Sequence, residues 1–234
     1  MDRTPRALTQ FRLLLGGCAW ILTPLYFVGQ ILVQAAWTTP YSMIDNRVSD
    51  LGNTTCGTTV ANTYICSPLH AVMNVTFILT GMLILIGVAL THSVWPPRHL
   101  TTWGLIMLGV AGAGTILVGL SPENVHMFIH VVGAVNIPAG NVAMILLGLA
   151  IWRDRRGPRI ELAWFSVLAG TVGLLGMLTG PFLMILTGHG GGLAERIALY
   201  PLIIWLVVVG VWCVDQAVRR KPGRARRMEV YAET

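Results

Sequence analysis

The sequence predicts an all-α, polytopic membrane protein, a bundle of six transmembrane helices arranged as three antiparallel hairpins. Long apolar stretches recur at 12–36, 68–91, 101–120, 127–151, 160–186 and 197–218. Each reaches the ~20 residues that an α-helix needs to cross a bilayer. The composition agrees, because 54% of the 234 residues are hydrophobic and only 11% are charged, less than half of the ~25% typical of a soluble domain.

The basic residues predict the orientation of this bundle. If both ends of the chain are cytoplasmic, all of the 16 Lys and Arg residues except Arg47 and Arg196 fall on inner segments. This positive-inside pattern predicts a multi-pass protein of the plasma (inner) membrane with its N- and C-termini in the cytoplasm. The formal charge of +6 then reflects short loops and a tail that meet anionic membrane lipids, and no nucleic-acid-binding motif is present.

The segments follow in order from this map. Residues 1–11 form a cytoplasmic N-terminus, 12–218 the six-span membrane domain and 219–234 a basic cytoplasmic tail. The first apolar stretch is too long for the core of a cleavable signal peptide, which indicates a retained helix. We expect the outer loop 38–67 to fold over the mouth of the bundle. Cys56 and Cys66 in this loop predict a disulfide that staples it, the alternative being two reduced thiols.

The later spans are joined by short inner turns at 93–100 and 153–159. Turns of this length make consecutive helices antiparallel neighbours. Four prolines lie inside spans, and each removes a backbone hydrogen bond and favours a kink. They are Pro24, Pro138, Pro181 and Pro201.

Polar side chains gather at the outer ends of the second and fourth spans and in the outer loops. At about 100° per residue, His126, His130 and Asn141 share one face of the fourth helix. Polar groups at membrane depth are unfavourable unless they are paired or hydrated, so they usually face the bundle interior. We therefore predict an outward-facing pocket that recognises a lipid or lipid-linked amphiphile. Its expected ligand-binding residues are Arg47, Asp50, His70, Asn74, Glu123, His126, His130, Asn141 and Arg196.

Other functions fit the same residues. In a zinc-dependent membrane hydrolase of a lipid amide or ester, His70, His126 and His130 would bind the metal. Asp50, Glu123 and Ser67 are the candidate catalytic residues of such an enzyme. A facilitative transporter is a further alternative, although no Asp, Glu or Lys lies at the centre of a span. A structural or assembly role, with the polar groups serving packing and Asp50–Arg47 or Glu123–Arg196 as ion pairs, also remains open.

Three motifs resemble a known family. They are the run Asn46–Gly52 (NRVSDLG), the run Cys66–His70 (CSPLH) followed by Asn74, and the run Val118–Asn124 (VGLSPEN) followed by His130 and Asn141. Together they resemble the bacterial six-span membrane family catalogued as domain-of-unknown-function family 998. The likeness covers about residues 12–218 and implies a topology but no reaction. Wider kin of that family, the Frag-one and damage-regulated autophagy modulator proteins, suggest lipid-linked roles. The zinc alternative is similar in its chemistry to alkaline ceramidases and progestin-receptor-like proteins.

Overall fold

Eight α-helices make up most of the computed structural model, which describes residues 4–58, 64–154 and 160–219. They are α1 (Thr4–Ile21), α2 (Leu25–Ala35), α3 (His70–Thr91), α4 (His99–Leu120), α5 (Glu123–Gly133), α6 (Asn136–Arg153), α7 (Ile160–Thr187) and α8 (Gly191–Arg219). Two short 3-10 helices, η1 (Ser49–Gly52) and η2 (His92–Val94), and the antiparallel strands β1 (Gly57–Thr58) and β2 (Tyr64–Ile65) connect them.

Six helical segments in the described part of the chain are long and apolar enough to cross a membrane. They are Ala7–Ala35, His70–Val94, His99–Leu120, Glu123–Arg153, Ile160–Thr187 and Gly191–Arg219. The predicted all-α, polytopic bundle is therefore confirmed. The first and fourth of these segments each contain two helices, α1 with α2 and α5 with α6.

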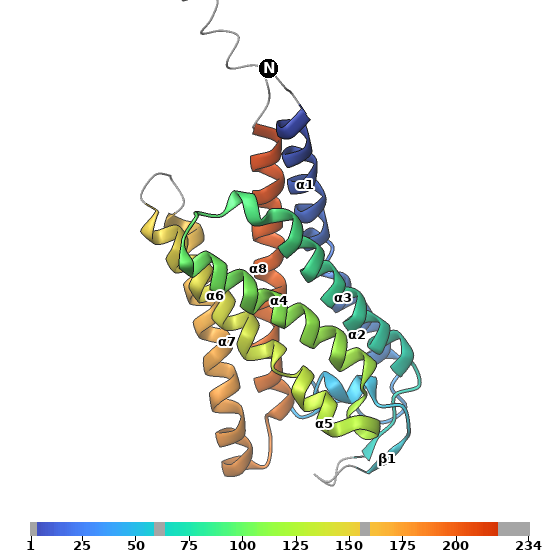
Figure 1. Cartoon of the computed structure of the whole chain (residues 1–234). Coiled ribbons are helices and arrows are strands. Elements are labelled where there is room, and N and C mark those ends of the chain that lie inside the picture. The colour runs from blue at the N-terminus through green and yellow to red at the C-terminus, as the bar shows by residue number, and fades with distance from the viewer. Residues whose placement is uncertain (1–3, 59–63, 155–159, 220–234) are drawn as a thin grey trace, which may run out of the picture.

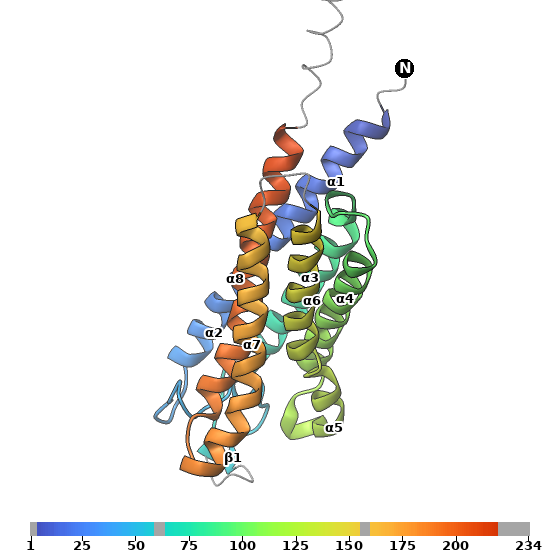
Figure 2. The same cartoon turned by 90° about the vertical axis from the view of Figure 1, so that its left-hand side faces the viewer.

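The spans form a closed ring in chain order. α1 packs on α3, α3 on α4, α4 on α6, α6 on α7, α7 on α8, and α8 returns to α1 (Figures 1 and 2). At the crossing of α1 and α8, a Cβ added to Gly17 would lie 2.8 Å from the carbonyl oxygen of Gly210. The two backbones approach this closely because neither residue has a side chain.

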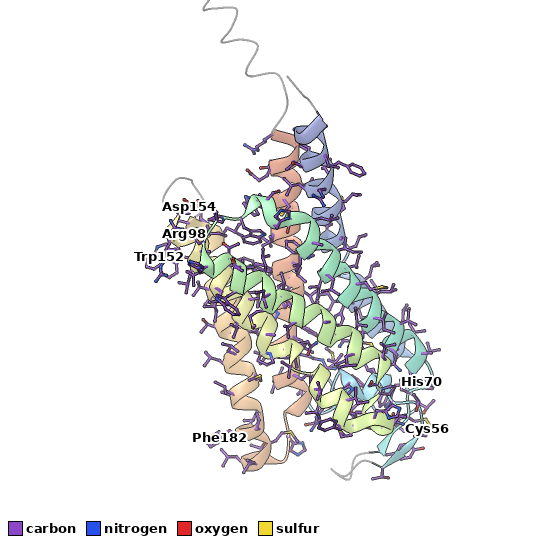
Figure 3. The ribbon with its side chains drawn as sticks, viewed as in Figure 1. Cys56, His70, Arg98, Trp152, Asp154 and Phe182 are labelled. Carbon is purple, nitrogen blue, oxygen red and sulfur yellow. A yellow bond between two sulfur atoms is a disulfide. The ribbon has the colours of Figure 1, made fainter. Side chains whose placement is uncertain are left out.

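The bundle has two distinct ends. The beginning of α1 and the last turn of α8 lie together at one end, which we call the terminal end; α5, β1 and the α7–α8 turn lie at the other, the loop end (Figures 1 and 2). Arg98, Trp152 and Asp154 are at the terminal end, whereas Cys56, His70 and Phe182 are at the loop end (Figure 3). The loop end carries the site described below.

Prolines account for both breaks in the spans. Pro24 has no N–H to donate to Trp20, and the backbone N–H and hydroxyl of Thr23 donate to that carbonyl instead. The second break lies between Gly133 and Asn136, where Ala134 stands four residues before Pro138. A proline ring clashes with the carbonyl four residues earlier, so α5 and α6 separate at that point. Pro181 and Pro201, by contrast, lie inside helices α7 and α8, which continue through them.

Aromatic packing holds the half of the bundle nearer the terminal end. Trp20 and Trp205 are fully buried, and their ring centroids are 6.2 Å apart. Each indole N–H has a partner, since Trp20 donates to the Ile84 carbonyl and Trp205 to the Ser166 hydroxyl. A second apolar cluster lies toward the loop end and includes Tyr26, Val48, Leu51, Met73 and Phe77.

Candidate functional site

The segment between α2 and α3 folds against the loop end of the bundle, and η1 is its anchor. A 3-10 helix has three residues per turn, so Val48 and Leu51 share a face. Both side chains are fully buried in the second apolar cluster. This orientation leaves Asp50, on another face of η1, at the wall of a pocket. We call residues 41–53 the cap.

Arg196 of α8 binds the backbone of the cap. Its Nη1 donates to the carbonyls of Met43 and Asn46, at 2.8 and 2.7 Å, and to Gly192 of its own helix. Its Nη2 donates to the hydroxyl of Tyr41. Burial raises the pKa of the Tyr41 hydroxyl even though Arg196 opposes the shift, so the phenol is neutral and accepts this bond.

Three further side chains bind cap backbone atoms. The Ser67 hydroxyl donates to the Leu51 carbonyl at 2.7 Å, and the Asn74 amide donates to the Gly52 carbonyl at 2.9 Å. Oε2 of Glu195 accepts the backbone N–H of Val48 at 2.6 Å. The cap backbone is therefore hydrogen-bonded by Ser67, Asn74 and Arg196. The Cys56–Cys66 disulfide, with Cα atoms 4.2 Å apart, lies beside the paired strands β1 and β2 that follow the cap.

A pocket of about 440 Å³ opens between the cap, α5 and the α7–α8 turn. Of the predicted ligand-binding residues, it brings together Arg47, Asp50 and Glu123. Its apolar lining includes Ile65, Met127 of α5 and Met184 of α7. The pocket thus combines charged groups with apolar side chains from β2, α5 and α7.

Two carboxyl groups meet at the bottom of this pocket. Asp50 is 7% exposed and Glu123 is 9% exposed. Burial, together with the charge and a side-chain hydrogen bond of Glu123, raises the pKa of Asp50 from 3.8 to about 8. Oδ2 of Asp50 also accepts the Arg47 backbone N–H at 2.7 Å, and Oε1 of Glu123 accepts a bond from the Asn53 amide at 3.0 Å. At neutral pH the Asp50 carboxyl therefore favours its protonated form.

A third carboxylate, Asp45, lies at the rim. Its Oδ1 is 3.1 Å from Nδ1 of His189 and accepts the backbone N–H of Gly190. These bonds, led by the one from Gly190, hold the pKa of Asp45 below its usual value. Gly188 and Gly190 have φ values of +72° and +92°, a conformation that favours glycine and lets the turn fold back to Asp45.

The ion pairs considered from the sequence do not form among the described residues. The ion pairs within that part of the chain are His189–Asp45 and Arg219–Asp215. The two Nη atoms of Arg196 bind carbonyls and Tyr41, and Asp50 binds the backbone rather than the guanidinium of Arg47.

The three histidines of the predicted zinc site do not line this pocket. Nδ1 of His70 is 3.0 Å from the Ser67 carbonyl, and Nδ1 of His130 is 2.9 Å from the Ser121 carbonyl. The inference that His126, His130 and Asn141 share one face was wrong, because the backbone of His126 is not helical (φ −135°, ψ 60°) and the span breaks after Gly133. His126 is exposed, whereas His130 and Asn141 are buried.

Asn141 serves helix packing. Its amide donates to Ile137 of α6 and to Ala198 of α8. His130 lines a second, internal cavity of about 40 Å³, which Tyr26, Asn136 and Glu195 also border. In the parts of the chain that the structure describes, no three His, Cys, Asp or Glu side chains are placed to hold a metal ion, so the three-histidine zinc site stays a prediction of the sequence.

Sequence reasoning missed several pocket residues. Asn53 and Asn124 lie beside the acids, and Met127 and Met184 form the apolar wall. The available signals were the two motifs, since Asn53 directly follows the NRVSDLG run and Asn124 ends the VGLSPEN run. Asn124 is held by the segment after the cap, since its side chain accepts the Thr54 N–H and donates to the hydroxyls of Thr54 and Thr55.

Comparisons with known proteins place the chain in a family without assigning it a reaction. A family model described as "Protein of unknown function (DUF998)" matches residues 21–212. No curated protein and no solved structure matched the chain. The matched region includes the cap, the acid pair and all six spans except the beginning of the first and the end of the last. The chain therefore belongs to the DUF998 family of multi-pass membrane proteins.

Proposed function

We infer that this protein recognises a lipid or lipid-linked amphiphile, whose headgroup enters the pocket at the loop end while its apolar chain lies along the bundle. The observation that carries this function is the composition of the pocket wall. Asp50 and Glu123 sit at its base, and two wall residues, Met127 and Met184, come from spans. An apolar chain could pack against these two methionines while a polar headgroup is held at the carboxyl groups.

The surroundings of the pocket favour an apolar chain beside it. Phe128 of α5 is 81% exposed and Ile185 of α7 is 83% exposed. Each directly follows a methionine of the pocket wall. An acyl chain leaving the pocket would therefore meet exposed apolar side chains at once, and van der Waals packing would hold it there, as it holds helices together in lipid.

We place the loop end outside the plasma membrane, with both termini in the cytoplasm. The distribution of Lys and Arg supports this orientation. The Cys56–Cys66 disulfide supports it independently, because disulfides persist in oxidising compartments. In intact cells, a membrane-impermeant maleimide should label Met43→Cys and leave Asp154→Cys unlabelled, both in a Cys18→Ser background. The opposite labelling would reverse the orientation.

Occlusion of the pocket tests the recognition itself. Met127→Trp puts a bulky ring into the pocket wall, while Met82→Trp makes the same change on α3, away from the pocket. Met82 is 39% exposed and Met127 50% exposed, so both sites accept a larger side chain. After limited delipidation, native mass spectrometry should show a tightly held phospholipid on the wild type and on Met82→Trp but not on Met127→Trp. Equal retention by all three proteins would refute the proposed function.

The described residues carry no observation that favours a zinc hydrolase or a transporter: the three histidines form no metal-binding group there, and the pocket lies at the loop end.

A further inference from the structure

Three side chains that line the pocket carry hydrogen-bond acceptors. Asp50 and Glu123 supply two carboxyl groups, and Asn53 supplies an amide oxygen. All three residues are less than a tenth exposed, Asn53 being 4% exposed. Oδ1 of Asn53 is buried and has no hydrogen-bond partner.

The orientation of the Asn53 amide is fixed by its neighbour. Oε1 of Glu123 is an acceptor, so the NH₂ end of Asn53 must face it, at 3.0 Å. The oxygen end then has no donor among the described residues. A buried acceptor left unpaired is unfavourable by about 1–3 kcal/mol, which a donor from a ligand would recover.

The charge balance at this place also favours a cation. Arg196 is committed to cap carbonyls, and His189 is paired with Asp45 at the rim. Glu195 of α8 adds further negative potential at Asp50. Arg47 is the remaining cation of the described pocket lining, and its side chain is exposed.

We propose that this acceptor cluster binds the primary ammonium group of a zwitterionic headgroup. The proposal rests on the proposed function and names its ligand class, an aminophospholipid-like amphiphile. The three N–H bonds of the ammonium group would be donated to Asp50, Glu123 and Oδ1 of Asn53. Arg47, across the same pocket, would face the anionic phosphate.

Binding changes the protonation of Asp50. Without a ligand, the raised pKa of Asp50 keeps its proton on the carboxyl near neutral pH. The charged groups that face Asp50 are Glu123 of α5 and Glu195 of α8, and the backbone N–H of Arg47 donates to it. An ammonium group replaces the proton of Asp50 as the counter-charge, and that proton leaves to solvent while the ligand keeps its own. Up to one proton should therefore be released per ligand at pH 7 and close to none at pH 9.

Short-chain phospholipids that differ only in the headgroup test the proposal. Dihexanoyl phosphatidylethanolamine, phosphatidylcholine and phosphatidylglycerol would be titrated into the purified, delipidated full-length protein by calorimetry. The ethanolamine lipid should bind at least tenfold more tightly than the choline lipid, because a trimethylated nitrogen has no N–H to donate. Repetition at pH 7 in buffers of different ionisation enthalpy would measure the released proton.

Variants separate the acceptors from the pocket as a whole. Asn53→Leu and Asp50→Asn should each remove most of the preference for ethanolamine over choline, while Asp154→Asn, at the terminal end, should keep it. Calcium chloride is the competing cation, since carboxylate and amide oxygens also suit Ca²⁺.

The outcomes distinguish the two proposals. If Met127→Trp abolishes binding of every phospholipid but the wild type binds the three headgroups equally, the ammonium site is refuted and amphiphile recognition stands. Tight binding of Ca²⁺ with no ethanolamine preference also refutes the ammonium site. If Met127→Trp changes nothing, amphiphile recognition in this pocket is itself refuted.

Discussion

Asp50→Asn should make the protein more stable at alkaline pH. The amide introduced by this substitution would imitate the protonated acid, since its oxygen can accept the Arg47 N–H and its NH₂ can donate to Glu123. In the wild type, the pKa of Asp50 rises from 3.8 in the unfolded chain to about 8 in the folded one. The folded state therefore prefers the protonated form.

The sign and size follow from linkage. The contribution of Asp50 to the free energy of unfolding is fully present below about pH 4, where both the folded and the unfolded chain are protonated. It falls as the pH rises, because the unfolded chain loses its proton first, and it is gone above about pH 8. Each unit of pH in this window lowers the free energy of unfolding by about 1.4 kcal/mol. Between pH 6 and pH 9 the loss is about 2–3 kcal/mol, which corresponds to roughly 5–10 °C in Tm for a chain of this size.

The assay is thermal unfolding in one detergent at pH 6, 7, 8 and 9. The wild type should lose stability across this range more steeply than Asp50→Asn, and the two curves should converge at the acidic end. Asp154→Asn is the matched control and should follow the wild type. If Asp50→Asn keeps the full pH dependence of the wild type, the pKa of Asp50 is not raised in the folded state as described.

The remaining predictions concern packing and the cap. Gly87→Ala would drive a methyl group into the indole of Trp20 and should lower the free energy of unfolding by about 1–3 kcal/mol, whereas Gly109→Ala meets no atom within 4 Å and should not lower Tm. Replacement of both Cys56 and Cys66 by Ser removes a crosslink between positions 10 apart and should lower the free energy of unfolding by about 2–3 kcal/mol. A wild-type Tm that does not change on addition of reductant would contradict this prediction. In Arg196→Lys, the single ammonium group cannot reach both Tyr41 and the cap carbonyls. The cap should therefore be held less firmly, and trypsin should cut after Arg47 faster than in the wild type. Arg12→Lys changes an exposed residue of α1 and should leave that rate unchanged.

The bundle was predictable from the sequence because its signal is local. Apolar stretches of membrane-spanning length need no knowledge of tertiary contacts, and the structure has all six. The two breaks were foreshadowed by Pro24 and Pro138. Pro181 and Pro201 gave the same signal without a break in the helix, so proline alone does not decide where a span divides.

The site was predictable only where its residues lie in short polar segments. Arg47, Asp50 and Glu123 stood out as charges beside apolar spans, and they share the pocket. The histidines were grouped on the assumption of one continuous helix, which the non-helical backbone of His126 and the break after Gly133 invalidate. Met127 and Met184 look like any other lipid-facing residues in the sequence. Their role depends on how α5 and the α7–α8 turn meet the cap, which is a long-range property.

The partners of Arg196 have a consequence for how the protein responds to its surroundings. The guanidinium is 3% exposed and its partners are backbone carbonyls and a phenol rather than carboxylates. Dissolved ions weaken attraction between exposed charges, with a screening length of about 8 Å at physiological ionic strength, but act little on buried dipoles. A change in ionic strength should therefore leave the attachment of the cap to α8 unaltered, in dilute buffer and in concentrated salt alike.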